Sequence, residues 1–329
     1  MLNMLNTQST PAPLRFADLL TPVTPAAFWE NNFAQHPLHI PAQGEKTRQL
    51  QSLMTFEALT QLLHFRVGYS LELIHQLQKY TFTPPLNTRA SQEQVQFLLQ
   101  QGASLVLEKV DQQSELLGIM CDQLSGELEC RTGFNLYLSY PQEAAFRLHY
   151  DTHDLFVLHL QGEKVWELYG ETTPYPTEKG RHINEAQPDK CLERFVLKPG
   201  DVLYIPKGHW HKALAQPHKD PSLHLTLGIY GPTGLDLLDY LKQALASRPE
   251  FRAPLFPLPY KATAQSEVLN GLKDQLKDFL GSPWQADFAS YLRHKTPRRT
   301  GFQLPQAYWR HPQEIPDTAQ FSRYLTAYT

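Results

Sequence analysis

The stretch from Phe134 to Tyr230 breaks into short runs of β-branched and aromatic residues, which turn-forming residues separate. Runs of this length and composition are typical of β-strands, and several at close spacing predict an all-β core. The Gln161-Gly162 and Pro199-Gly200 pairs are predicted to close hairpins of a sandwich or small barrel. The predicted strands are Asn135–Tyr140, Phe146–Asp151, Leu155–Leu160, Glu163–Tyr169, Val202–Ile205 and Ser222–Tyr230.

Helical patterns precede this β region. Thr24 before Pro25 indicates the start of one helix, because proline suits the first helical position. Ser91 is three residues before Gln94 and predicts a capping box for another helix. An apolar stripe at 116–124 predicts a third. The expected fold class is therefore mainly β with flanking helices.

Two more apolar helical stripes follow Tyr230. Because apolar helix faces attached to a finished β core still need partners, we expect a homodimer through residues 232–295. We also expect a disordered N-terminus at 1–13, a β-rich domain with N-terminal helical elements at 14–231, and a helical region at 232–329. The two stripes consist of Leu235, Leu238, Leu241 and Leu245, and of Leu269, Leu272, Leu276 and Phe279.

The composition excludes several classes of protein. Thirty Lys and Arg residues against 33 Asp and Glu residues give a net charge of −3, so no overall field attracts nucleic acid or anionic lipid. No window approaches the roughly 18 apolar residues of a membrane helix, and the first residues do not form a signal peptide. The three cysteines have no metal-like spacing and are expected to be reduced thiols. We therefore expect a soluble, cytoplasmic protein.

A small set of polar residues in the β region suggests a metal site. In the predicted strand at 146–151, alternation places His149 and Asp151 on one face. Later in the chain, a turn and a buried strand lead to His211. Two histidines and one carboxylate on neighbouring strands form the facial triad that suits Fe(II) and leaves three adjacent coordination positions open. His209 is the rival for the third position, because it lies on the same face if the strand continues.

Three segments carry a family resemblance: NLYLSYPQEAAFRLHYDTHDLFVLHLQGEKVWELYG, LKPGDVLYIPKGHWHKA and LHLTLGIYG. They resemble the Jumonji-C (JmjC) oxygenases, which depend on Fe(II) and 2-oxoglutarate. The sequence is most similar to the cupin-like ribosomal oxygenases and to the asparaginyl hydroxylase that acts on a hypoxia transcription factor. The detailed match covers roughly residues 130–231. The resemblance implies a double-stranded β-helix, that is, a jelly-roll or cupin barrel, over 14–231, with Fe(II), 2-oxoglutarate and O2 as cofactor and co-substrates.

The resemblance also assigns roles to residues. It makes His149, Asp151 and His211 the iron ligands and places Lys164 against the distal carboxylate of 2-oxoglutarate. Alternation along 222–229 independently puts polar residues, Thr226 among them, on one face, which is expected to look into a cavity while the leucines pack outward. The residues implied to line the co-substrate or substrate pocket are Thr226, Asn135 and Tyr137.

The activity implied by the resemblance is hydroxylation of an amino-acid side chain in a protein or peptide, with release of succinate and CO2 and with ribosomal proteins among the candidate partners. The alternatives are hydroxylation of a small molecule or free amino acid, demethylation of N-methyl-lysine, and a non-catalytic metal-binding cupin.

Departures from the family pattern concern the substrate side and the C-terminus. The length after Lys295 is expected to be too short for the winged-helix domain of ribosome-directed members. Phe146 and Leu155 stand where the asparaginyl hydroxylase has polar residues, so a drier pocket is expected. The basic cluster at 294–299 is interpreted as a solvated run of charges.

Overall fold

The computed structural model describes residues 13–140, 146–178, 186–215, 220–255, 262–296 and 298–300. The chain divides into two units, 1–299 and 300–329, and the description below concerns the first. The N-terminus expected to be disordered at 1–13 lies outside the described residues, apart from its last residue. None of the described helices is long and apolar enough to span a membrane.

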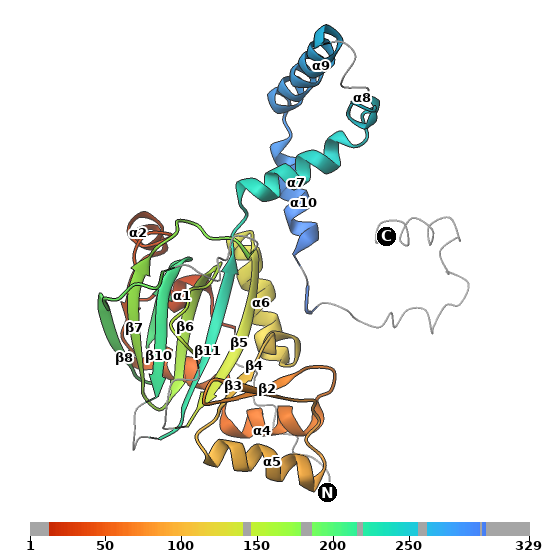
Figure 1. The fold of residues 1–329 in the computed structure, drawn as a ribbon. Helices are drawn as coiled ribbons and strands as arrows, with labels where there is room; N and C mark the ends of the chain where they lie inside the picture. The colour runs from red at the N-terminus through yellow and green to blue at the C-terminus, as the bar shows by residue number, and fades with distance from the viewer. Residues whose placement is uncertain are drawn as a thin grey trace, which may run out of the picture. The chain divides into compact units, whose positions relative to one another are not determined.

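Two antiparallel sheets form the centre of the fold (Figure 1). The large sheet has the strand order β1-β9-β6-β11-β5-β4-β2-β3, and the small sheet has the order β10-β7-β8. The predicted strands at 202–205 and 222–230 are confirmed residue for residue. The strands are β1 (Leu38–Ile40), β2 (Leu71–His75), β3 (Gln78–Phe82), β4 (Ser104–Leu107), β5 (Arg131–Ser139), β6 (Asp154–Gln161), β7 (Lys164–Glu171), β8 (Glu193–Leu197), β9 (Val202–Ile205), β10 (His209–Ala215) and β11 (Ser222–Tyr230).

The two predicted hairpins are wrong, because each turn carries the chain from one sheet to the other. Gln161-Gly162 joins β6 of the large sheet to β7 of the small sheet, and Pro199-Gly200 joins β8 of the small sheet to β9 of the large sheet. At Gly162 the backbone has a φ of +70°, and an added Cβ would lie 2.4 Å from the carbonyl oxygen of Pro221. This crossing of the chain between facing sheets gives the double-stranded β-helix expected from the sequence.

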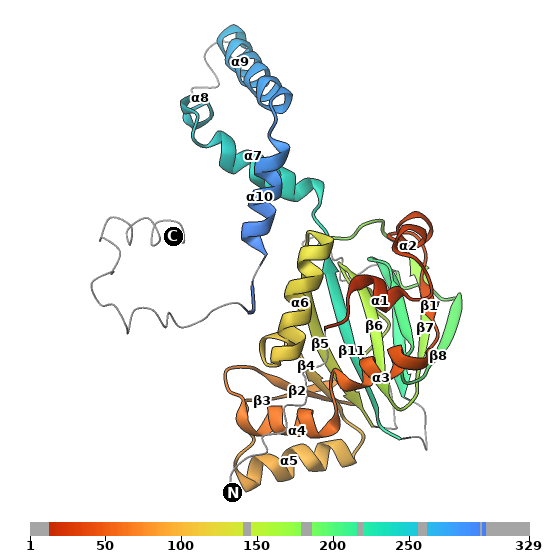
Figure 2. The same ribbon diagram turned by 180° about the vertical axis from the view of Figure 1, so that it is seen from behind.

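Helices lie on one face of the large sheet, and Figure 2 shows α1, α3 and α6 in front of it. The α2 cap is as predicted, since Thr24 Oγ1 accepts from Ala27 N at 3.2 Å. The cap predicted at Ser91 is wrong: α5 begins at Arg89, and Thr88 is its N-cap. The helices are α1 (Phe16–Leu20), α2 (Pro25–Asn31), α3 (Gly44–Ser52), α4 (Phe56–Phe65), α5 (Arg89–Gln100), α6 (Glu115–Leu128), α7 (Gly234–Leu245), α8 (Pro249–Arg252), α9 (Ala262–Gly281) and α10 (Gln285–Lys295), with a 3-10 turn at Val110–Gln112.

The main hydrophobic core lies between these helices and the large sheet. Leu223, Leu225 and Leu227 of β11 are fully buried in it, together with residues of α1, α3 and α6. Burial of this kind stabilises the fold by about 2 kcal/mol per leucine side chain. The prediction that the leucine face of β11 packs outward is confirmed, and the opposite face is left to line the space between the two sheets.

The C-terminal basic cluster is not uniformly solvated. The Arg299 side chain is only 8% exposed and forms ion pairs with Asp111 and Asp122. The backbone N–H of Arg299 also donates to Asp122 Oδ1 at 3.0 Å. The interpretation as a solvated run is therefore wrong for Arg299, because carboxylates that are distant in sequence meet it in the fold.

Candidate active site

The two histidines of the predicted triad meet through their backbones. His149 lies between β5 and β6, and among the described residues 146–151 it alone forms a β-bridge, so the predicted strand at 146–151 is wrong in extent. His149 N donates to His211 O at 3.2 Å, and His211 N donates to His149 O at 2.7 Å. This bridge places one histidine beside the other at the edge of β10.

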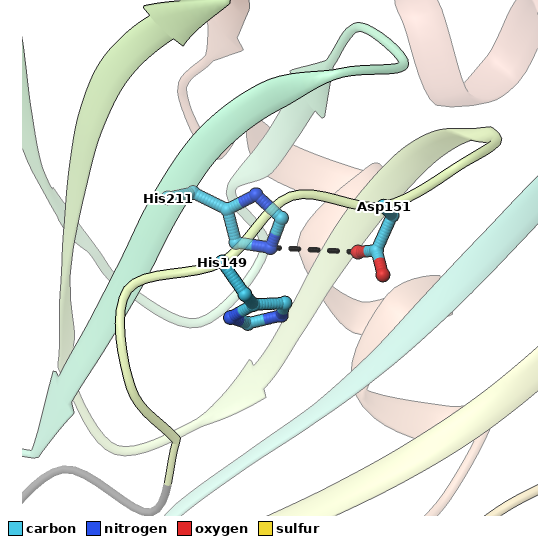
Figure 3. Close-up of side chains that lie close together, drawn as sticks. All are labelled: His149, Asp151 and His211. Atoms are coloured by element: carbon cyan, nitrogen blue, oxygen red, sulfur yellow. Dashed lines mark ion pairs between the residues drawn. The ribbon is translucent and has the colours of Figure 1, made fainter. Parts of the chain in front are cut away.

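Asp151 completes a compact group with these histidines, as Figure 3 shows. Its Oδ2 lies 3.4 Å from His211 Nε2, and the two imidazole centroids are 4.5 Å apart. One ligand atom from each of the three residues lies within 4.8 Å of the others. The His211 side chain is 4% exposed and that of Asp151 is 26% exposed, so the group is open on the Asp151 side.

Hydrogen bonds orient both imidazole rings in the same way. His149 Nδ1 lies 2.9 Å from the carbonyl oxygen of Arg147, and His211 Nδ1 lies 2.9 Å from that of His209. A carbonyl oxygen can only accept, so each Nδ1 carries the hydrogen and each Nε2 keeps its lone pair. Burial, followed by the neighbouring His149, lowers the pKa of His211 to about 4. His211 is therefore neutral near pH 7, the form that binds a metal.

The donor set fits Fe(II). Two imidazole nitrogens and one carboxylate oxygen on one side of an ion leave adjacent positions for a chelating co-substrate and dioxygen. Among the described residues, His149, Asp151 and His211 are the one such group of three metal-ligating side chains. His209 is not part of it and lies opposite Glu171 in the β10–β7 pair. The structure thus brings His211, and not its rival, to the other two residues.

A cavity extends from this group into the space between the sheets. Its lining combines the three polar ligands with aromatic and aliphatic side chains and with a buried lysine. Phe146 and Leu155, predicted to make the pocket drier, are both in the lining. The lining residues are Tyr137, Ser139, Phe146, His149, Asp151, Leu155, Lys164, Trp166, His211, Ala213, His224 and Thr226.

Three of the four residues expected to bind co-substrate line this cavity. Lys164 is 5% exposed, its Nζ donates to Ser139 Oγ at 2.7 Å, and burial lowers its pKa to about 7. Tyr137 and Thr226 also line the cavity, and burial raises the pKa of Tyr137. Asn135 does not: its Oδ1 accepts from the backbone N–H of Lys109 at 2.9 Å, and its side chain hydrogen-bonds Tyr137.

The site prediction did not include Ser139 or Trp166, and it gave no role to His224, which alternation places with Thr226 on the cavity-facing side of 222–229. Alternation carried a signal for all three. Ser139 follows Tyr137 by two residues on β5, and His224 precedes Thr226 by two residues on β11, so each points to the same side as a predicted site residue. Trp166 is two residues after Lys164 on β7. One face each of β5, β7 and β11, rather than isolated positions, therefore contributes these residues to the cavity lining.

Comparison with known families agrees with this geometry. Residues 108–237 match the family model of the JmjC domain. This segment is a JmjC domain. It contains all three members of the triad, the lysine at the inner end of the cavity and the remaining residues predicted for the site.

Curated proteins are similar in sequence to more of this chain than the segment matched by the JmjC model. A bifunctional lysine-specific demethylase and histidyl-hydroxylase NO66 of Drosophila persimilis is 28% identical over 217 residues, which are 65% of this chain and 31% of that protein. Human ribosomal oxygenase 1 is 27% identical over 311 residues, which are 92% of this chain and 45% of that protein. The chain thus spans less than half the length of these two relatives.

Solved structures of Escherichia coli YcfD share the fold. One has a TM-score of 0.59 at 16% identity and covers 86% of this chain and 75% of its own. Another, described as a ribosomal oxygenase in complex with cobalt and 2-oxoglutarate, has a TM-score of 0.58 at 17% identity, covering 89% of this chain and 75% of its own. The likeness therefore includes the regions that flank the JmjC domain as well as the domain itself.

Proposed function

We propose that this protein is an Fe(II)- and 2-oxoglutarate-dependent oxygenase that hydroxylates an amino-acid side chain in a protein or peptide. The observation that carries the proposal is one cavity with His149, Asp151 and His211 towards its opening and a buried Lys164 further in. The names of the relatives support it, since they include a histidyl-hydroxylase and ribosomal oxygenases. Ribosomal proteins are accordingly our first candidate substrates.

Different residues along the cavity would bind the metal and the co-substrate. His149, Asp151 and His211 would hold the iron through two neutral imidazoles and one carboxylate. When bound, the iron supplies the activation of dioxygen and the oxidative decarboxylation of 2-oxoglutarate to succinate and CO2. Lys164 would bind the distal carboxylate of 2-oxoglutarate through a charge-assisted hydrogen bond. The co-substrate would then lie between the iron ligands and Lys164.

Apolar side chains near the triad would position the substrate. Phe146 is partly exposed and lies with its ring centroid 5.9 Å from that of His149 and 6.0 Å from that of Tyr137. Leu155 lines the same cavity. These side chains would hold a substrate C–H group beside the metal and exclude water from it, which prevents side reactions.

An anaerobic titration of the Fe(II)-loaded protein with 2-oxoglutarate tests the cofactor pair without a known substrate. We expect the visible charge-transfer band of the chelated complex in wild type and no band in Asp151→Ala. Iron retained without a band would favour a non-catalytic metal-binding cupin.

Succinate release with ribosomal proteins but not with free amino acids would support a protein substrate. A gain of one oxygen in the product mass indicates hydroxylation, and loss of a methyl group indicates demethylation.

The homodimer remains our proposal for the helical region at 232–295. Only the second half of the α7 stripe is buried: Leu241 and Leu245 pack in a small cluster with Tyr240, whereas Leu235 and Leu238 are 58% and 60% exposed. Two exposed leucines one turn apart support a second apolar contact. Replacing both with Glu should convert a dimer to a monomer in light scattering. The matched control is Phe97→Glu on α5, also 61% exposed.

A cytoplasmic location is likewise a proposal. It is supported by three free thiols, of which Cys121 and Cys130 are buried and Cys191 is exposed. Thiols persist in reducing compartments.

A further inference from the structure

The segment that carries Asp151 is hydrogen-bonded to the turn between β9 and β10, from which the chain continues to His211. Gly208 N donates to Asp151 O at 2.9 Å. The neighbouring Lys207 N donates to Asp154 Oδ1 at 3.3 Å. One backbone bond and one side-chain bond therefore join the two parts of the chain that bring Asp151 and His211 together.

The carboxylate of Asp154 is held by a second donor, the hydroxyl of Tyr204. Asp154 is 7% exposed, and its Oδ1 accepts from Tyr204 Oη at 2.5 Å. Hydrogen bonds to a carboxylate are about twice as strong as those between neutral groups. The Tyr204 ring is fully buried, with its centroid 4.8 Å from that of Phe28 and 4.9 Å from that of Phe156. A closely packed tyrosine thus fixes the position of the carboxylate.

The same hydroxyl connects this carboxylate to the N-terminal part of the fold. Ala34 N, between α2 and β1, donates to Tyr204 Oη at 2.9 Å. The hydroxyl of Tyr204 therefore donates to Asp154 and accepts from Ala34, which uses both of its hydrogen-bonding roles.

These bonds and the bridge between the two histidines enclose all three proposed metal ligands. On one side of Asp151, His149 exchanges two backbone hydrogen bonds with His211. On the other side, Asp154 accepts from Lys207. Asp151 itself belongs to no strand, so the regular pairing of a sheet does not set its position. The distance between Asp151 and His211 therefore depends on the bonds at both sides.

Asp201 provides a comparison, because it is a similar carboxylate next to the opposite end of β9. It is 5% exposed and accepts from two backbone N–H groups, those of Ala42 at 2.7 Å and Lys198 at 3.0 Å. His39 Nε2 is 3.1 Å from its Oδ2. Asp201 thus has the burial and the bonding of Asp154, but the segments that it joins contain no proposed metal ligand.

We infer that Asp154 and Tyr204 are positioning residues for the metal, which hold Asp151 at the distance from His211 that metal binding requires. The inference rests on the proposed function and extends it to two residues outside the cavity lining. Residues that orient metal ligands without binding the metal typically change metal affinity or activity about 10- to 100-fold when they are replaced.

Titration with Co(II), followed through its visible absorption bands, measures metal affinity and ligand geometry without turnover. Asp154→Ala should lower the Co(II) affinity about 10- to 100-fold and change the bands. Tyr204→Phe keeps the packed ring and removes only the hydroxyl, so the affinity should fall about tenfold, the lower end of that range. Asp154→Asn keeps an oxygen that accepts from both donors, so its affinity should stay within about threefold of wild type.

Asp201→Ala is the matched control for a merely structural effect. It should lower the melting temperature, as Asp154→Ala does, but leave the Co(II) bands unchanged and the affinity within about twofold, as for a site distant from the metal. An equal loss of Co(II) affinity in Asp201→Ala would overturn the inference, because any weakening of the fold would then produce it.

Two further results would contradict the assignment. Wild-type Co(II) affinity and bands in Tyr204→Phe would overturn it, even if Asp154→Ala does not fold. A loss in Asp154→Asn as large as that in Asp154→Ala would also overturn it, because the charge of the carboxylate and not its hydrogen bonds would then matter. Failure of the wild-type protein to bind Co(II) would instead overturn the proposed function.

Discussion

Burial lowers the pKa of a cation-forming side chain at both ends of the cavity, with opposite consequences for binding. At the triad, burial keeps His211 neutral, and the neutral imidazole is the form that binds a metal. At the inner end, burial lowers the pKa of Lys164 to about 7, whereas the form that binds a carboxylate is the charged one. At the triad, His211 is therefore already in its metal-binding form in the ligand-free protein. The lysine end acquires its full charge only when an anion offsets the loss of hydration.

The two ends also differ in how their residues are held. The triad comes from a segment between strands and from the edge of β10, and backbone carbonyls fix its rings. Lys164 and His224 lie within regular strands and are 5% and 2% exposed. Substitutions at His149 and Asp151 should therefore leave the fold intact, while substitutions at the buried strand residues His211, Lys164 and His224 should change stability as well as binding.

The largest expected effect is at the triad. Asp151→Ala removes one of three ligands and should reduce turnover at least about a thousandfold, since loss of supporting residues alone costs 10–100-fold in metal affinity or activity. Because Asp151 is partly exposed and lies outside the regular strands, the melting temperature should remain close to that of wild type. Succinate release and thermal unfolding measure the two effects. Loss of the folded state would show that Asp151 is structural.

Lys164→Met should weaken co-substrate binding and at the same time stabilise the ligand-free fold. It should weaken 2-oxoglutarate binding about a hundredfold, the upper range for a hydrogen bond to a charged group. It should also raise the melting temperature of the ligand-free protein, because the unfolded chain holds the Lys164 proton up to about pH 10.5 and the folded protein only to about pH 7. Below about pH 10.5 the lysine therefore favours unfolding, most strongly at pH 7 and below, and methionine removes that effect. A lower melting temperature would contradict this account of burial.

The pH dependence of co-substrate binding follows from the same shift. Above pH 7 the ligand-free protein loses the Lys164 proton, so 2-oxoglutarate binding must take up a proton, and affinity should fall about tenfold per pH unit. His224 and His159, which face Lys164 from the large sheet, are neutral over this range because burial lowers the pKa of both. Titrations between pH 7 and 9 in buffers of different ionisation enthalpy measure the uptake. Lys164→Arg, which remains charged, should flatten the profile.

The smallest expected effect is at Thr226, between the two ends. Thr226→Val keeps the shape of the side chain and removes a hydroxyl from the cavity lining. We expect 2-oxoglutarate affinity to fall about three- to fivefold, as for one neutral hydrogen bond. Thermal unfolding should shift by only a few degrees, because the residue is not fully buried. An unchanged affinity would remove Thr226 from the co-substrate site.

The sequence by itself determined the strands whose alternation is regular and the residue types of the site. The leucines of β11 predicted one face of the core, and His149, Asp151, His211 and Lys164 were named from pattern and resemblance, because both are local properties. It did not distinguish a hairpin from a crossing between sheets, since Gly162 and Gly200 suit either.

Only the tertiary structure decided contacts between distant residues. It paired His149 with His211 through a single bridge, placed Ser139 beside Lys164, and buried Arg299 against Asp111. Within the part of the chain that the structure describes, it also gave His224 Nδ1 no hydrogen-bond partner at the inner end of the cavity. No local pattern contains these facts, because the spacing along the chain does not specify which strands become neighbours or how much water each side chain loses. Burial and strand pairing are properties of the packed molecule, and they set the charge of Lys164 and the orientation of the triad.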